Sequence, residues 1–356
     1  MIKTRIFTIL TLILLLLFTA CSQSQETIKI GLILPLTGAG SGIGQIFLEG
    51  TQLAADDINS KNILNKKIEL VVEDTASDPK NAVTAMKKLI EVNHIRLFIT
   101  TLSSHGLAIK PIAIENKVLL FEDVAHPKIT GDSELIFRHS NVADEEGVLL
   151  ANQAIDLNAK KVGILYANDE YGVILKENLI TNLKETDINT IAEAIDLKGS
   201  DFKTEILKVT NNVDTVIIGA LGPAFNIAVK QVKESRFKGN IILNVGAILG
   251  DLFQVGITIE GMYYSDYPFT YLDSWDIFKE RYKKTYNKEA KPFHPIPYGT
   301  IELIVEGIKR ANSEDPIKIA KAIKEINEFK GTFETIKINE KGDAIIPLIV
   351  KQYQKS

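Results

Sequence analysis

The chain has 356 residues, enough for about two domains. Its 41 basic and 45 acidic side chains give a formal net charge of −4, and 45% of its residues are hydrophobic against 24% charged. This composition excludes a disordered chain and a protein with several membrane spans. The chain is mildly acidic and has no block of basic residues, so its charge does not favour binding to nucleic acid.

The first predicted element is an N-terminal export signal. Lys3 and Arg5 precede an uncharged stretch, residues 6–20. Its 15 residues suit the hydrophobic region of a signal peptide and are short for a membrane span, which needs about 20. We therefore expect residues 1–20 to be a signal peptide.

The only cysteine of the chain, Cys21, directly follows this stretch. Small residues before a cysteine at such a place resemble the bacterial lipoprotein signal, in which cleavage precedes the cysteine and its thiol carries a diacylglycerol. Phe18 departs from the aliphatic residue that is usual there. An ordinary secretory signal and an uncleaved anchor helix are the alternatives. We expect lipidation at Cys21, with 21–27 as a tether that holds the mature chain outside the cytoplasmic membrane.

Strand and helix patterns then alternate. The predicted strands are 28–34, 68–72, 95–99, 118–121, 162–166, 213–218 and 241–243. The predicted helices are 45–59, one opened by Asp78-Pro79, 104–115, 144–157, 171–184, 202–211 and 223–235. Near-continuous Ile, Val and Leu strands that alternate with helices indicate parallel sheets covered on both faces, so the fold class is α/β.

The rhythm changes after about residue 265. Predicted helices and extended stretches follow there, at 274–286, 297–311, 316–325, 333–338 and 345–350. No period of 20–50 residues repeats. The natural division between the two sets of strand–helix units falls near 139–142.

The chain lacks the motifs of common enzymes. Gly38, Gly40, Gly42 and Gly44 follow the first strand, but Ile43 stands where a dinucleotide site needs its third glycine. There is no P-loop and no Gly-x-Ser-x-Gly, and the five histidines show no metal-ligand spacing. We therefore expect no enzyme activity, no cofactor and no metal.

Seven stretches, in order, resemble the leucine/isoleucine/valine-binding branch of the solute-binding proteins of ABC transporters. They are Gly31 to Gly38, Glu49 to Asn59, Glu73 to Ala82 (with Asp78-Pro79), Thr101 to Ser104, Ala125 to Thr130, Asp169 to Gly172, and Gly342-Asp343. The resemblance covers about 28–353.

This resemblance implies the two-lobed type I periplasmic-binding fold, with three hinge crossovers and a ligand trapped when the lobes close. The crossovers would fall near 139–142, 264–268 and 344–347. Lobe 1 would then combine 28–140 with 266–345. Lobe 2 would combine 141–265 with 346–356.

The resemblance also implies ligand-binding residues. Ser104, beside Ser103, would hold a ligand carboxylate at a helix N-terminus, although both serines could simply cap that helix. Tyr171 matches a tyrosine that lines the pocket, and its alternative is a surface aromatic in a turn. Ile43 stands where the family often has an aromatic cover.

Three departures concern the clamp for an α-amino acid. Ala125 replaces a threonine, Leu221 lies in a segment, 220–222, that lacks an expected tyrosine, and Gly246 stands where an acid would hold the ammonium. Asp123, close to Val124 and Ala125, is a candidate replacement on a cleft-facing loop, and its alternative is a solvated loop. We expect a small, partly apolar ligand rather than a typical branched-chain amino acid.

The sequence thus predicts a lipid-anchored solute receptor that delivers its ligand to the permease subunits of an ABC importer. The alternative is an envelope lipoprotein that uses the same fold to contact a protein partner or sensor. A cleft too poor in polar groups to hold a solute would favour this alternative.

Overall fold

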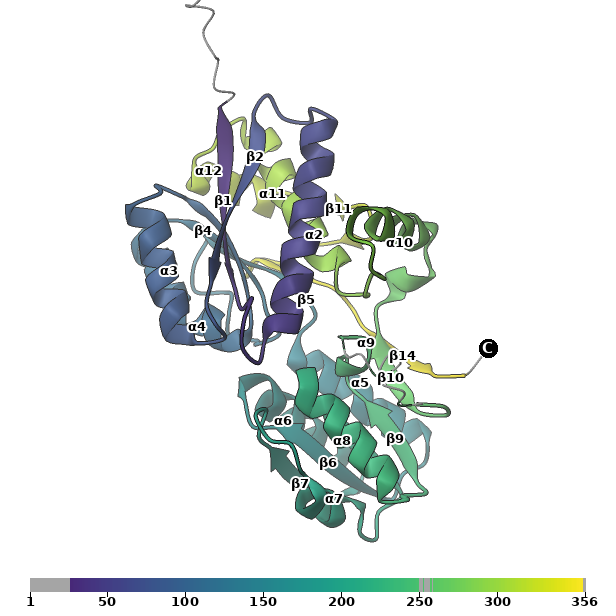
Figure 1. Cartoon of the computed structure of the whole chain (residues 1–356). Helices are drawn as coiled ribbons and strands as arrows, with labels where there is room; N and C mark the ends of the chain where they lie inside the picture. The colour runs from purple at the N-terminus through teal and green to yellow at the C-terminus, as the bar shows by residue number, and fades with distance from the viewer. Residues whose placement is uncertain (1–25, 250–251, 253–256, 258, 355–356) are drawn as a thin grey trace, which may run out of the picture.

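A computed structural model describes residues 26–354, except 250–251, 253–256 and 258. It has two lobes, each built on a six-stranded sheet with helices on both faces (Figure 1). The predicted α/β fold with parallel sheets is thereby confirmed. The predicted signal peptide and the predicted lipidation site, Cys21, lie outside the described residues.

The sheet of the first lobe has the strand order β13-β5-β4-β3-β1-β2, and all its pairings are parallel. Its strands are β1 (Thr27–Leu34), β2 (Lys67–Asp74), β3 (Leu97–Thr101), β4 (Leu119–Asp123), β5 (Ile136–Ser140) and β13 (Asp343–Ile345). On one face pack α2 (Ser41–Ser60), α11 (Pro295–Ala311) and α12 (Pro316–Lys324), and on the other α3 (Pro79–Glu91) and α4 (Ser103–Glu115).

The sheet of the second lobe has the order β14-β10-β9-β8-β6-β7, in which only β14 runs antiparallel. Its strands are β6 (Lys161–Ala167), β7 (Asn189–Ile195), β8 (Thr215–Gly219), β9 (Asn240–Leu243), β10 (Tyr263–Asp266) and β14 (Ile349–Gln352). On one face pack α5 (Ala143–Asp156) and α6 (Glu170–Lys184), and on the other α7 (Lys203–Thr210) and α8 (Gly222–Glu234). A short helix, α9 (Gly246–Leu249), follows β9.

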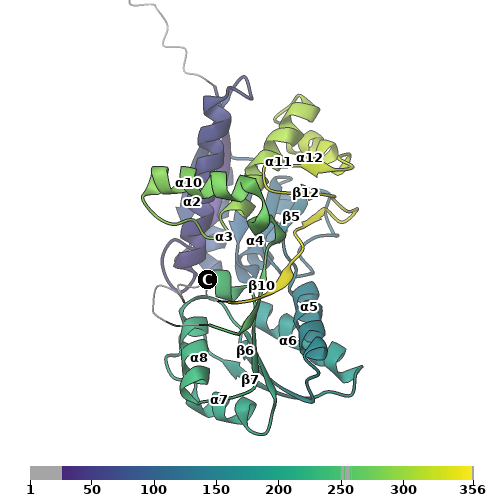
Figure 2. The same ribbon diagram turned by 90° about the vertical axis from the view of Figure 1, so that its right-hand side faces the viewer.

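The chain passes between the two sheets three times: after β5, after β10, and between β13 and β14. Figure 2 shows β10 and the last strand running through the narrow region between the lobes. After the second passage, the first lobe gains the 3₁₀ helix η1 (Pro268–Tyr271), α10 (Asp273–Tyr286) and a small pair of strands, β11 (Phe329–Lys330) and β12 (Thr335–Ile336).

Local sequence signals explain several boundaries. Asp78 caps α3 because its Oδ1 accepts a hydrogen bond from the backbone N–H of Lys80 at 2.8 Å, and Pro79 occupies the first helical position, as predicted. By contrast, the sequence did not predict β5, because Arg138 and His139 interrupt its apolar pattern. Both side chains are nevertheless buried. The single stretch predicted at 345–350 contains parts of two strands, β13 and β14, that belong to different sheets.

Helices long and apolar enough to span a membrane do not occur within the described part of the chain.

Candidate functional site

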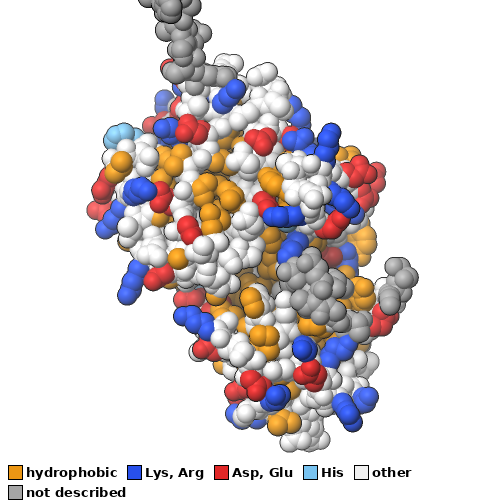
Figure 3. Space-filling view, in the orientation of Figure 1, with side chains coloured by type: hydrophobic (Ala, Val, Ile, Leu, Met, Phe, Trp, Pro, Cys, Tyr) orange, Lys and Arg blue, Asp and Glu red, His pale blue; other side chains and the backbone are white. Residues whose placement is uncertain are grey.

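The lobes face one another with the carboxyl ends of their parallel strands. In open α/β sheets, ligands bind outside these strand ends. Helices α4 and α6 contact each other across the division between the lobes. On the face shown in Figure 3, hydrophobic side chains gather along the waist between the lobes. This region is the candidate site.

In the first lobe, α4 presents an uncapped N-terminus at this site. Leu102 precedes the helix with a φ of 72°, a conformation that costs a residue with a side chain about 1–3 kcal/mol and is typical of functional sites. Ser103 and Ser104 form the start of the helix and are partly exposed. Within the described residues, neither hydroxyl has a hydrogen-bond partner. The first backbone N–H groups of the helix that donate a hydrogen bond are those of His105 and Gly106. The turn therefore offers free donors, which suit a carboxylate.

In the second lobe, Tyr171 lies in the first turn of α6, which Asp169 caps through a 2.8 Å bond from the N–H of Gly172. Its side chain is only 5% exposed, so it is not a surface aromatic. Its hydroxyl donates a hydrogen bond to Glu146 Oε2 at 2.5 Å and accepts one from Asn244 Nδ2 at 2.8 Å. Burial raises the pKa of Tyr171 well above its usual value, and the negative charge of Glu146 adds to the rise.

Glu146 on α5 is the centre of this network. Its Oε1 accepts hydrogen bonds from the N–H of Val245 at 2.7 Å and from the hydroxyl of Ser265 on β10. Burial raises the pKa of Glu146, and these bonds together with that from Tyr171 oppose the rise. One buried carboxyl group thus joins α5, α6, the segment after β9, and the strand that leaves the lobe.

The candidate acid Asp123 lies at the carboxyl edge of the first sheet. It is the last residue of β4 rather than part of a loop, and its Oδ2 accepts a 2.6 Å hydrogen bond from Thr300 on α11, inside the first lobe. His139 Nδ1 lies 2.9 Å from the same Thr300 hydroxyl, and its Nε2 lies 2.6 Å from Glu334 Oε1. Burial raises the pKa of Asp123 to about 7, and the charge of His139 opposes the rise.

The predicted apolar contacts divide between several clusters. Ala125, Tyr171 and Leu221 share a cluster centred on the second lobe. Leu221 also packs on the main cluster of the first lobe, to which Ile43 belongs, so it lies between the lobes. Val124 is buried in a different cluster of the first lobe, on the face covered by α3 and α4.

Gly246 is buried where the resemblance would place an acid. A Cβ atom at this position would lie 2.3 Å from the carbonyl oxygen of Ala220 and 2.8 Å from Asn244 Oδ1. No side chain fits there without backbone movement. The packing of the segment after β9 therefore accounts for the missing acid.

Sequence reasoning missed Glu146 and Ser265. Acidic residues in the first turn of a helix are usually exposed and favour the helix dipole, so Glu146 reads as a surface residue. A signal was nevertheless present, because Glu146 lies at helical spacing with Ala143 and Leu150 on the buried stripe of α5.

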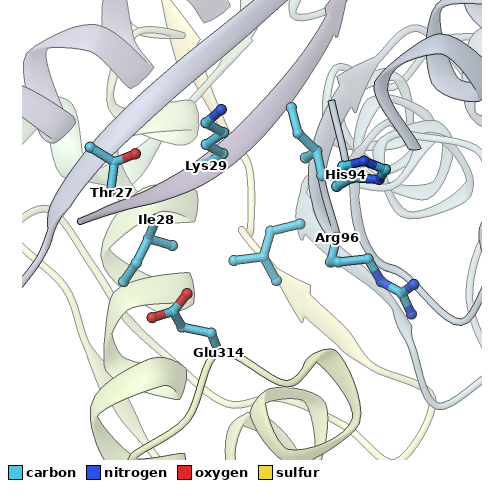
Figure 4. A pocket seen from close by; sticks show the side chains of 8 residues that line it. Thr27, Ile28, Lys29, His94, Arg96 and Glu314 are labelled. Carbon is cyan, nitrogen blue, oxygen red and sulfur yellow. The ribbon is translucent and has the colours of Figure 1, made fainter. Parts of the chain in front are cut away.

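A separate cavity of about 170 Å³ lies at the other end of the first sheet. It is lined at the amino ends of β1 and β3 by Thr27 and Leu97, and Glu314 approaches it from the loop before α12 (Figure 4). This cavity is thus distinct from the region between the lobes. The described residues also contain no cluster of three or more His, Cys, Asp or Glu suited to a metal ion.

Comparisons with known proteins agree with this geometry. Residues 27–355 match a family model described as periplasmic binding protein. The Leu/Ile/Val-binding protein homolog 2 of Brucella abortus (strain 2308) is 27% identical over 346 residues, which cover 93% of this chain and 92% of that protein. The Leucine-, isoleucine-, valine-, threonine-, and alanine-binding protein of Pseudomonas aeruginosa is 26% identical over 350 residues, covering 92% of this chain and 89% of that protein.

A solved structure is similar over the same range. The crystal structure of a leucine-binding protein from Thermotoga maritima superposes with a TM-score of 0.84 at 28% identity, covering 92% of this chain and 96% of that chain. Because the family model spans nearly all of the sequence, the chain belongs to the periplasmic binding protein family.

Proposed function

We propose that this chain is an extracytoplasmic, lipid-anchored solute-binding protein of an ABC importer. It captures a small organic ligand, amino-acid-like or a carboxylate or amide, by closure of its two lobes, and passes it to the permease subunits. The observation that carries the proposal is Leu221, which follows β8 and packs against the apolar clusters of both lobes at the facing strand ends. A ligand between the lobes would extend this contact and stabilise the closed state.

Polar groups of the first lobe and apolar surface from both lobes are proposed to hold such a ligand. The free N–H groups and hydroxyls of Ser103 and Ser104 suit a carboxylate. Ile43, Ala125, Leu221 and Tyr171 supply apolar surface. Asp123 Oδ2 accepts a hydrogen bond from Thr300, whereas Oδ1 has no hydrogen-bond partner among the described residues, so Asp123 is proposed as a partner for a donor group of the ligand.

The lobes are proposed to comprise 28–140 with 266–345, and 141–265 with 346–356. Cleavage of residues 1–20 and lipidation of Cys21 would leave 21–27 as the tether. Replacing Cys21 by serine should abolish the incorporation of labelled fatty acid into the protein in cells, because serine has no thiol to form the thioether. Incorporation that persists in the Cys21→Ser variant would contradict lipidation at this position.

A thermal-shift screen of residues 22–356, refolded to remove bound ligand, tests the solute-binding proposal. The library holds amino acids, small carboxylates, amides, ureas and short peptides. A ligand at 100 times its Kd should add about 2.7 kcal/mol to the free energy of unfolding, which corresponds to a rise of several degrees in Tm.

The variant Ser104→Ala should lose most of this shift. Ser60→Ala is the matched control, because Ser60 ends α2, about 30 Å along that helix from its cleft end. If the protein is well folded and no compound raises its Tm, the ligand to look for is a protein partner in the cell envelope.

A further inference from the structure

Three large hydrophobic side chains are exposed at the amino edge of the first sheet, which is the edge away from the candidate site. Ile63 lies between α2 and β2, Val92 between α3 and β3, and Ile114 in the last turn of α4 before β4. Because the strands are parallel, the connections that enter them lie at the same edge. Val92 is 69% exposed. A single exposed hydrophobic residue is ordinary, but several at one edge indicate an interaction surface.

A fourth exposed hydrophobic side chain, Ile317, belongs to the same edge. It lies in the first turn of α12, and Glu314, three residues earlier, forms a 2.6 Å ion pair with Lys66 just before β2. Figure 1 shows α12 at the same end of the lobe as the start of β1. The cavity described above also lies here, and Lys29 and Arg96 are among its lining residues (Figure 4).

Basic side chains at the amino edge mostly lack an acidic partner. Five of them form no ion pair within the described residues: Lys29, Lys61, Lys67, Arg96 and Lys117. Most acids of this edge are engaged, Glu26 and Glu314 with Lys66, Asp315 with the first N–H groups of α12, and Glu69 with the Thr27 hydroxyl, which leaves Glu91 and Glu115. The unpaired cations therefore outnumber the unpaired acids, and this charge suits the phosphate groups of lipids.

The chain enters the first lobe at this same edge. Strand β1 begins with Thr27, and Cys21 lies six residues earlier. Even when fully extended, a stretch of this length spans at most about 20 Å. A lipid on Cys21 would therefore hold the amino edge close to the membrane, so the membrane is the first surface that this edge meets.

We propose that the amino edge of the first lobe rests on the membrane surface. Its four exposed hydrophobic side chains enter the head-group region, and Lys29 and Arg96 contact lipid phosphates. The second lobe then lies on the side away from the membrane (Figure 1), and the carboxyl edge that carries the candidate site does not face the lipid. This inference rests on the lipid anchor of the proposed function.

The single cysteine of the chain allows a test that does not depend on lipidation in cells. Residues 21–356 are coupled through the Cys21 thiol to a maleimide-bearing lipid in vesicles of phosphatidylcholine and phosphatidylglycerol. The vesicles also contain a brominated lipid, which quenches the fluorescence of nearby tryptophan. The reporter variant is Val92→Trp, and Leu207→Trp is its matched control, because Leu207 on the second lobe is 65% exposed.

The natural protein supplies the baseline, because its only tryptophan, Trp275, is 7% exposed. Quenching should exceed this baseline in Val92→Trp and remain at it in Leu207→Trp. Replacing Ile63 and Ile317 together by serine should remove most of the quenching in Val92→Trp. Replacing Ile277, which is exposed on α10, by serine should leave it unchanged.

Baseline quenching in Val92→Trp, equal quenching in the two reporter variants, or quenching that survives the double substitution would overturn the inference. So would sedimentation of the uncoupled chain as a dimer that the double substitution dissociates, because the edge would then bind a second copy of the chain. The coupling to lipid is chemical, so these results leave solute binding and the lipidation of Cys21 to their own tests.

Discussion

The carboxyl group of Glu122 on β4 lies against Gly106 in the first turn of α4, so closely that a Cβ atom on residue 106 would sit 2.2 Å from Oε2. Glu122 has no exposed surface, and neither of its oxygens has a hydrogen-bond partner among the described residues. An acid therefore lies buried directly behind the turn that carries Ser103 and Ser104.

Burial raises the pKa of Glu122 to about 8, and the charges of Lys110 on α4 and Arg138 on β5 oppose the rise, while Asp132 adds to it. The folded state thus binds this proton more tightly than the unfolded chain, whose glutamate has its ordinary pKa of 4.5. Between pH 4.5 and about 8 the group costs stability as the pH rises, by up to about 1.4 kcal/mol per pH unit.

The variant Glu122→Gln removes this cost. Its free energy of unfolding, measured by urea denaturation from pH 5 to pH 8, should therefore rise relative to the natural protein as the pH increases. The contribution of Asp123 is present in both proteins and cancels in the difference. The control Glu115→Gln, at the exposed end of α4, should follow the natural protein. A constant difference between Glu122→Gln and the natural protein across this range would contradict the assignment.

The close packing of Gly246 predicts a second stability change. In Gly246→Ala, the new Cβ would meet the carbonyl oxygen of Ala220 at 2.3 Å, so the segment after β9 must shift. Overpacking of this kind costs about 1–3 kcal/mol, which denaturant titration measures directly.

Gly42→Ala is the matched control for this substitution. Gly42 lies in the first turn of α2, and a Cβ atom there would meet nothing within 4 Å. Because alanine favours helix by up to about 1 kcal/mol over glycine, this control should be neutral or stabilising. Equal effects of the two substitutions would mean that Gly246 is not tightly enclosed.

The sequence predicts the order of the strands and helices better than it predicts the residues of the site. Apolar runs and the Asp78-Pro79 start of α3 mark elements locally, and local signals survive folding. The partners of buried polar groups are fixed only by tertiary packing. The sequence cannot tell that Glu146 in α5 points into the lobe, or that the Asp123 carboxyl group meets Thr300 from a helix 177 residues away. From the sequence alone, acids at such positions are interpreted as solvent-exposed, because their burial depends on how the surrounding elements pack.

The position of Leu221 between the lobes predicts a change in shape. In Leu221→Ala, apolar contact with the first lobe is lost, at about 25 cal/mol per Å² of surface no longer buried, together with part of the contact that Leu221 makes inside the second lobe. The balance between closed and open arrangements should therefore move towards the open one. Small-angle X-ray scattering of the ligand-free protein should record a larger radius of gyration. Leu207→Ala is the matched control, because Leu207 on α7 is 65% exposed and touches neither the hinge nor the first lobe's cluster. If the radius of gyration is unchanged in both Leu221→Ala and the control, the Leu221 contact does not determine how the lobes are arranged. The proposal of closure around a ligand would then lose the support that this contact gives it.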